Sequence, residues 1–245
     1  ELVLSEDSQA QSVRAADLGK LNALTQGKVV AFAADTIEGS ADSVVALLGE
    51  RNLQHVLFGD SVTIDLTDTA VLRADTLSFI SGALGGDTGG VVDARDAASV
   101  QGAAGQLLAV TADSSTTHGV VLATDVDLVV TEGLQGAAVV QRADSVLALS
   151  GRTTGEVYAL GAGTIEGSYG ALSLLADSIV AGDVVLSGVV PVVLTVGADK
   201  AAQAVELTGL VAESVYGAVY AGAVTVVSGL MDELLDVADS ATAGA

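Results

Sequence analysis

Apolar residues in the first part of the chain recur at helical spacing and then give way to a β-like run. Residues 12–24, SVRAADLGKLNAL, carry apolar side chains three to five positions apart, which is typical of an amphipathic helix. The apolar positions of this predicted helix are Val13, Leu18, Leu21 and Leu24. Residues 28–35, KVVAFAAD, are rich in β-branched and aromatic residues and predict a strand, because such side chains fit a pleated surface.

A second helix and two more strands are predicted next. Residues 40–49, SADSVVALLG, have the helical pattern, with Ser40 or Asp42 as the N-cap and Gly49 as the C-terminal stop. The runs HVLFGD and VTIDLTD, between residues 55 and 68, predict strands. The same order recurs between residues 141 and 197.

Two sets of sequence markers indicate that the chain repeats itself. Leucine pairs begin at residues 47, 107, 174 and 234, with steps of 60, 67 and 60. The segments RAADL, RADTL, RADSV and QAVEL begin at Arg14, Arg73, Arg142 and Gln203, with steps of 59, 69 and 61. Both sets have the longer middle step, so the sequence predicts a single array of four diverged units. The predicted units are residues 1–61, 62–125, 126–189 and 190–239, with residues 240–245 as a flexible tail.

Half of each predicted unit, a strand plus a short helix, is too small to bury its own apolar face. Stacked neighbours would bury that face continuously, which is the principle of a solenoid. The predicted fold class is therefore a repeat solenoid, α/β or β-rich, in which stacked coils of strand plus short helix build a parallel sheet.

Composition limits the residue types that can form the core and the classes of partner that the chain can bind. Half of the residues are apolar but only 3% are aromatic, so the core is predicted to consist of thin layers of Val, Leu, Ala and Ile. The net charge of −22 disfavours nucleic acid and anionic lipid and favours counter-cations such as calcium. The absence of Cys excludes disulfides and thiolate zinc sites.

The most membrane-like run is residues 179–198, IVAGDVVLSGVVPVVLTVGA. Asp183, Gly182, Gly188 and Pro191 interrupt it, and β-branched residues dominate it. The run therefore predicts two buried strands joined by a turn, and the chain is predicted not to span a membrane.

Residues 157–168, VYALGAGTIEGS, resemble the phosphate-binding turn of a nucleotide-binding enzyme. Gly161, Gly163 and Gly167 have the spacing G-x-G-x-x-x-G, one residue longer than the dinucleotide fingerprint. The counterpart VVAFAADTIEGS, at residues 29–40, has Asp35 where the later copy has Gly163, and an aspartate there would repel phosphate. Nucleotide binding is therefore not predicted.

The shared sequence TIEGS has a structural interpretation. Gly39 and Gly167 are predicted to adopt backbone angles that other residues avoid, and Ser40 and Ser168 to cap the following helices. Two further roles complete the prediction: Ile37 and Ile165 fill the layer beneath, and Glu38 and Glu166 lie near the helix starts.

Other candidate sites give no catalytic residue. Residues 82–96, GALGGDTGGVVDARD, offer glycine turns with aspartates and are the best calcium candidate, although a loop between coils explains them as well. His55 and His118 lie at corresponding strand entries but have no obvious co-ligands. The sequence around Ser168, EGSYG, is not G-x-S-x-G. The sequence therefore predicts no enzyme, no catalytic or cofactor-binding residue, and leaves a metal site open.

Residues 13–48 and 62–82 resemble the Ala/Thr/Val/Asp-rich tandem repeats of giant surface and secreted proteins in bacteria, notably marine cyanobacteria. The segments that carry the likeness are VRAADLGKLNALTQGKVVAFAADTIEGSADSVVALL and VTIDLTDTAVLRADTLSFISG. The resemblance implies an extracellular or cell-surface structural protein, S-layer-like or adhesive, and no catalytic residue.

The expected function is thus a non-enzymatic structural repeat protein that assembles into a surface layer, filament or adhesive stalk, with calcium as a possible aid. Expected partners are further copies or neighbouring repeats of a longer chain. The alternative is a fibre module that binds a receptor or glycan. The opening residues, ELVLSEDSQ, contain no Met and no apolar leader, which favours a processed product or a piece of something longer.

Overall fold

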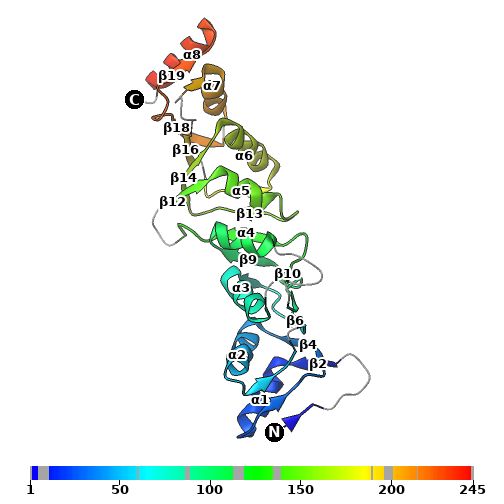
Figure 1. The fold of residues 1–245 in the computed structure, drawn as a ribbon. Coiled ribbons are helices and arrows are strands. Elements are labelled where there is room, and N and C mark those ends of the chain that lie inside the picture. Colours follow the sequence, from blue (N-terminus) through cyan, green and yellow to red (C-terminus); the bar gives the residue numbers. More distant parts are fainter. Residues whose placement is uncertain are drawn as a thin grey trace. The chain divides into compact units, whose positions relative to one another are not determined.

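The computed structural model describes residues 2–4, 11–59, 61–85, 89–112, 119–134, 139–188, 190–195, 201–213 and 215–243. These residues have a mixed α/β fold with eight helices and several parallel sheets (Figure 1). The chain divides into two compact units, Glu1–Val126 and Asp127–Ala245. The boundary between them lies one residue from the repeat boundary predicted after residue 125.

In the first unit, each helix packs against the next one along the chain. The helices are α1 (Ala15–Leu24), α2 (Ala41–Asn52), α3 (Ala74–Ala83) and α4 (Ala104–Ala112). The strands are β1 (Leu2–Val3), β2 (Gln11–Arg14), β3 (Val29–Val30), β4 (Ala34–Gly39), β5 (Val56–Leu57), β6 (Thr63–Leu66), β7 (Val71–Arg73), β8 (Val91–Asp93), β9 (Ser99–Gly102) and β10 (Gly119–Val121).

The second unit repeats this order of elements, again with successive helices in contact. The helices are α5 (Ala143–Ser150), α6 (Tyr169–Ala181), α7 (Ala204–Ala212) and α8 (Met231–Ala243). The strands are β11 (Asp127–Val130), β12 (Val139–Arg142), β13 (Val157–Tyr158), β14 (Ala162–Gly167), β15 (Val184–Val185), β16 (Val190–Leu194), β17 (Ala201–Gln203), β18 (Tyr216–Tyr220) and β19 (Val226–Ser228).

Three kinds of strand surround the helices. A leading strand runs directly into a helix, a trailing strand is the first strand after a helix, and a bridging strand lies between a trailing and a leading strand. The five-stranded sheet of the first unit has the order β2, β4, β6, β8, β10, which is two leading strands, one bridging strand and two trailing strands. The four-stranded sheet of the second unit, β12, β14, β16, β18, has the same order with one trailing strand.

Rows of buried aliphatic residues run across these parallel sheets. In the first unit Ile37, Ile64, Val92 and Val120 lie opposite one another on β4, β6, β8 and β10, and each is at most 1% exposed. The predicted core of small aliphatic layers is therefore confirmed along this row. In the second unit the buried Gln141 takes the place that Val13 has on β2, and its side-chain amide donates to Glu132 at 3.3 Å.

Helix boundaries differ from the sequence predictions in two places. The segment predicted as one helix from residue 12 is β2 up to Arg14 and helix only from Ala15, so Val13 is a strand residue paired with Ile37. Leu24 is 83% exposed, while Ala15 and Leu18 are the buried residues of α1. Gly49 does not end α2, which continues to Asn52.

The single strand predicted at residues 28–35 is wrong. β3 ends at Val30 and β4 begins at Ala34, with a turn between them in which Phe32 is 64% exposed. The two strands belong to different sheets, because β3 pairs with β5 and β4 with β6.

Only one of the two sets of repeat markers occupies equivalent positions in the structure. Arg14, Arg73, Arg142 and Gln203 each lie at the N-cap of a helix, directly before a buried alanine. The leucine pairs do not occupy equivalent positions. Leu47 and Leu48 are both buried seven and eight residues into α2, whereas Leu174, on α6, is 60% exposed.

The apolar run 179–198 contains two strands, as predicted, but its first residues belong to a helix. The end of α6 reaches Ala181, and Gly182, with a φ of 89°, terminates it before β15. In the described residues, the structure has no helix long and apolar enough to cross a membrane. The segment predicted as a tail from residue 240 is helical in α8 as far as Ala243.

Candidate functional site

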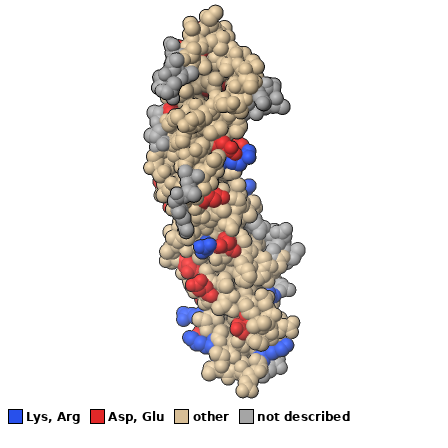
Figure 2. Space-filling model, turned by 90° about the vertical axis from the view of Figure 1, so that its left-hand side faces the viewer, with Lys and Arg blue, Asp and Glu red and all other residues tan. Residues whose placement is uncertain are grey.

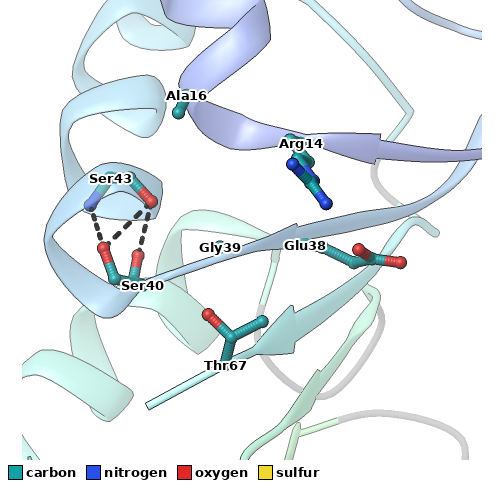
Figure 3. Close-up of a pocket in the computed structure, with 7 residues that line it drawn as sticks. All are labelled: Arg14, Ala16, Glu38, Gly39, Ser40, Ser43 and Thr67. Atoms are coloured by element: carbon teal, nitrogen blue, oxygen red, sulfur yellow. Dashed lines mark hydrogen bonds between the residues drawn. The ribbon is translucent and has the colours of Figure 1, made fainter.

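An open pocket of about 360 Å³ lies at the corner where β4 leads into α2, the first copy of TIEGS (Figure 3). Its lining residues are Arg14, Ala16, Glu38, Gly39, Ser40, Ser43 and Thr67. Arg14 and Glu38 lie opposite each other on the neighbouring strands β2 and β4. Ser40 and Ser43 are joined at the start of α2, where the Ser43 backbone N–H donates to Ser40 Oγ at 3.3 Å.

Two backbone amide groups at the start of α2, those of Ala41 and Ser43, have hydrogen-bond partners within the protein. Besides the Ser40 cap, the backbone N–H of Ala41 donates to a carboxylate oxygen of Asp68 at 2.6 Å. The backbone N–H of Thr67 donates to the Gly39 carbonyl at 3.0 Å. A phosphate at the start of α2 would have to displace Asp68 from the Ala41 amide, and the cationic lining residue, Arg14, lies opposite the carboxylate of Glu38, so the corner does not provide the free amides and net positive charge of a phosphate site.

The second copy of the corner, at β14 and α6, has no free space beside Gly161, one of the two glycines that the first copy lacks. A Cβ placed on Gly161 would be 2.3 Å from the Glu132 carbonyl oxygen and 2.6 Å from the backbone nitrogen of Leu134. The turn at residues 132–134 therefore occupies the volume that a phosphate would need. The glycine here permits a close approach of two backbone segments, which supports the structural interpretation of VYALGAGTIEGS.

The glycines that the two copies of TIEGS share are required for a different reason from the one predicted. Neither Gly39 nor Gly167 has a positive φ, so the prediction of special backbone angles is wrong. A Cβ on Gly39 would lie 3.1 Å from the Cβ of Ala15, and one on Gly167 would lie 2.8 Å from the Cβ of Ala143. Each glycine therefore lets the start of one helix approach the strand that leads into the following helix.

The same glycine–alanine contact occurs at two corners that lack TIEGS. A Cβ on Gly102 would lie 2.8 Å from that of Ala74, and one on Gly229 would lie 2.7 Å from that of Ala204. The sequence analysis missed this rule. Its signal is present in the chain, because an alanine follows each of the four Arg or Gln markers and a glycine follows 24 to 28 residues later.

The other predictions for TIEGS are confirmed in part. Ser168 Oγ accepts the backbone N–H of Ala171 at 3.3 Å, so both serines cap their helices. Ile37 and Ile165 are fully buried. The glutamates have their partners on the adjacent strand: Ser12 donates to Glu38, and Arg142 lies 3.9 Å from Glu166.

A row of carboxylates runs across three strands beside the pocket. Glu38, Asp65 and Asp93 lie opposite one another on β4, β6 and β8. Burial raises the pKa of Asp65, and the negative charges of Asp93, Glu38 and Asp96 raise it further, against an opposing effect from Arg95. Asp93 behaves oppositely, because the hydrogen bond from Arg95, with Nε 2.9 Å from Oδ1, lowers the pKa of its carboxyl group.

Replacing Asp65 by Asn is expected to stabilise the protein near neutral pH. A raised pKa means that the folded state favours the protonated form, so the cost of the charge is present above the ordinary pKa of 3.8 and absent below it. The urea midpoint of Asp65→Asn should therefore exceed that of the unmodified protein at about pH 7 and match it at about pH 3. Asp93→Asn is the matched control and should lower the midpoint at about pH 7. Equal responses of the two variants would contradict the assignment.

Metal candidates receive little support from the geometry. Among the residues that the structure describes, no group of three or more His, Asp or Glu side chains could hold a metal ion. His55 Nδ1 lies 2.9 Å from Glu50, whose other contact is the side-chain amide of Asn22. Asp87, in the calcium candidate 82–96, and His118 lie outside the described residues.

Comparison with known proteins leaves the family open. No protein-family model matches the chain, and neither a curated protein nor a solved structure does. The resemblance to bacterial tandem-repeat surface proteins therefore stays a prediction.

Proposed function

We propose that this chain is a non-enzymatic structural protein of the bacterial cell exterior, in which stacked coils form a solenoid that assembles into a layer, filament or stalk. A coil here is a helix with its leading and trailing strands. The proposal includes the four repeat units of about sixty residues inferred from the sequence.

One observation carries the proposal. Within each unit the strand pairs are parallel and join residues between 23 positions apart, as for Gln11 and Ala34, and 29 positions apart, as for Leu128 and Val157. That step is about one coil of chain, so each strand pairs with a strand that lies about one coil further along the chain. Such pairing is the repeating contact of a solenoid.

The corners support a structural role as well. Their serines, glycines and backbone amides are used to cap helices and to bring successive coils together. This is the use expected of residues that repeat with the architecture, because every coil has to solve the same packing problem.

Self-association of the full chain tests the proposed function. Light scattering and electron microscopy are expected to show ordered assemblies, with calcium increasing their amount and a chelator reversing that increase. Magnesium serves as the control for simple charge screening of the acidic chain. A monodisperse monomer in every condition would contradict the proposal, and retention on a glycan array would favour the fibre alternative instead.

A further inference from the structure

The first and last strands of the chain form two partial sheets that complement each other. β17 and β19 are a pair of leading strands, and β19 has no second strand partner among the described residues. β1 lies in the bridging position before β2, and it forms a sheet with the trailing strands β3 and β5. Two leading strands followed by one bridging and two trailing strands is the composition of the complete sheet β2, β4, β6, β8, β10.

The residues at the two open edges are those that the complete sheet buries. Val227 lies four residues before α8, as Ile37 lies four residues before α2, and Leu2 pairs with a trailing strand as Ile64 does. Ile37 and Ile64 are fully buried opposite each other, whereas Val227 is 37% exposed and Leu2 is 41% exposed. Pairing Val227 with Leu2 would restore the buried row.

The helices expected to meet at the proposed contact differ in charge. The first helix carries both signs, because Lys20 forms an ion pair with Asp17 at 2.9 Å, and Figure 2 likewise shows blue Lys or Arg and red Asp or Glu side chains in its lower part, where Figure 1 places α1 and α2. α8 carries Asp232, Glu233 and Asp236 and no basic residue. Because α2 packs against α3 in the first unit, an added first coil would bring its α1 against α8.

We propose that β19 of one copy pairs in parallel with β1 of a second copy, which completes a five-stranded sheet head to tail. This inference rests on the proposed function, and it names the surfaces and the partner, a second copy of this chain. An edge strand is a ready template for such pairing. Because the two surfaces differ, the contact is heterologous, so it extends into a filament unless the rotation between copies closes a ring.

Blocking each end separately tests the proposal. Val227→Lys places a charge at the tail edge and Leu2→Lys places one at the head edge, both at partly exposed positions that should tolerate it. Each variant alone is expected to stay monomeric, because every copy carries the same charged edge and its unchanged edge therefore has no unchanged complementary edge to pair with. An equimolar mixture is expected to give a dimer that grows no further, since the open head of one variant meets the open tail of the other. Leu174→Lys, at a 60% exposed site on α6, is the control and should assemble like the unmodified protein.

The experiment distinguishes failure of the head-to-tail contact from failure of the proposed structural function. Assembly of the unmodified protein that Val227→Lys and Leu2→Lys leave intact would overturn the head-to-tail contact and leave the structural function standing. A monomeric unmodified protein in all conditions would overturn both, including the case in which further coils of a longer chain cover these edges. Dimers of a single blocked variant would show a symmetric contact and would also overturn the inference.

A second measurement remains decisive where a lysine variant does not fold. The chain has no Cys, so single cysteines report contacts without background. The register of β4 on β6 places Val3 opposite Ser228 in the proposed pair. Val3→Cys mixed with Ser228→Cys should give a disulfide-linked heterodimer under mild oxidation. Val3→Cys mixed with Asn52→Cys, at the end of α2, should not, and equal cross-linking in both mixtures would overturn the proposed register.

Discussion

Ile64→Ala is expected to lower the free energy of unfolding by about 3 kcal/mol, because the side chain is fully buried and its removal leaves a cavity. Ile64 lies on the bridging strand β6, between Ile37 on a leading strand and Val92 on a trailing strand. The substitution therefore weakens the sheet at the bridging strand, which joins the leading strands to the trailing strands. Urea unfolding followed by far-UV circular dichroism measures the loss.

The control for Ile64→Ala is a neighbouring aliphatic residue that is not buried. Val71, on β7, is 52% exposed, so Val71→Ala should change the free energy of unfolding by less than about 0.5 kcal/mol. Similar losses for the two variants would contradict the role of the buried row. The comparison also tests the parallel register, since that register is what places Ile64 between two other aliphatic residues.

Gly167→Ala is expected to cost about 2 kcal/mol, because the new Cβ would lie only 2.8 Å from the Cβ of Ala143 and the start of α5 would have to shift. Ala143→Gly removes the opposing methyl group and should restore part of the loss in the double variant. The coupling energy between the two sites is expected to be about 1 kcal/mol or more. All four Tyr residues lie in the second unit, so tyrosine fluorescence during urea unfolding reports this change locally.

Gly170→Ala is the matched control three residues further on. Nothing lies within 4 Å of a Cβ at Gly170, and alanine favours helices over glycine by about 1 kcal/mol, so this variant should be as stable as the unmodified protein or more so. A harmless Gly167→Ala with no coupling to Ala143 would contradict the close-approach explanation.

The local chemistry of the corner could be predicted from the sequence because it depends on residues close together in the chain. Ser40 and Ser168 cap their helices through contacts three residues away. Ile37 and Ile165 fall on the buried side because alternation along a strand fixes the face. The reason for Gly39 and Gly167 could not be predicted in this way, since their alanine partners lie 24 residues earlier.

The repeat markers also separate what the sequence could predict from what it could not. The Arg and Gln markers coincide with helix N-caps, because each precedes a buried alanine where the chain changes from strand to helix. The leucine pairs are out of register, because leucine, valine and alanine exchange freely within a helix face while total packing is maintained. Composition alone could not distinguish the buried Leu47 from the exposed Leu174.

By itself the sequence determined the approximate positions of the helices in the first and third predicted units and the small aliphatic character of the core, since these follow from periodicity, capping and composition. It did not determine the number of strands, because the leading strand β2 was predicted as helix and β3 and β4 as a single strand. Only the tertiary structure decided which strands share a sheet. In the first unit, the sheet that begins with the leading strands β2 and β4 passes through β6 to the trailing strands β8 and β10. The physical reason is that strand edges pair through backbone groups common to every residue, so side-chain patterns fix the face of a strand but not its neighbour.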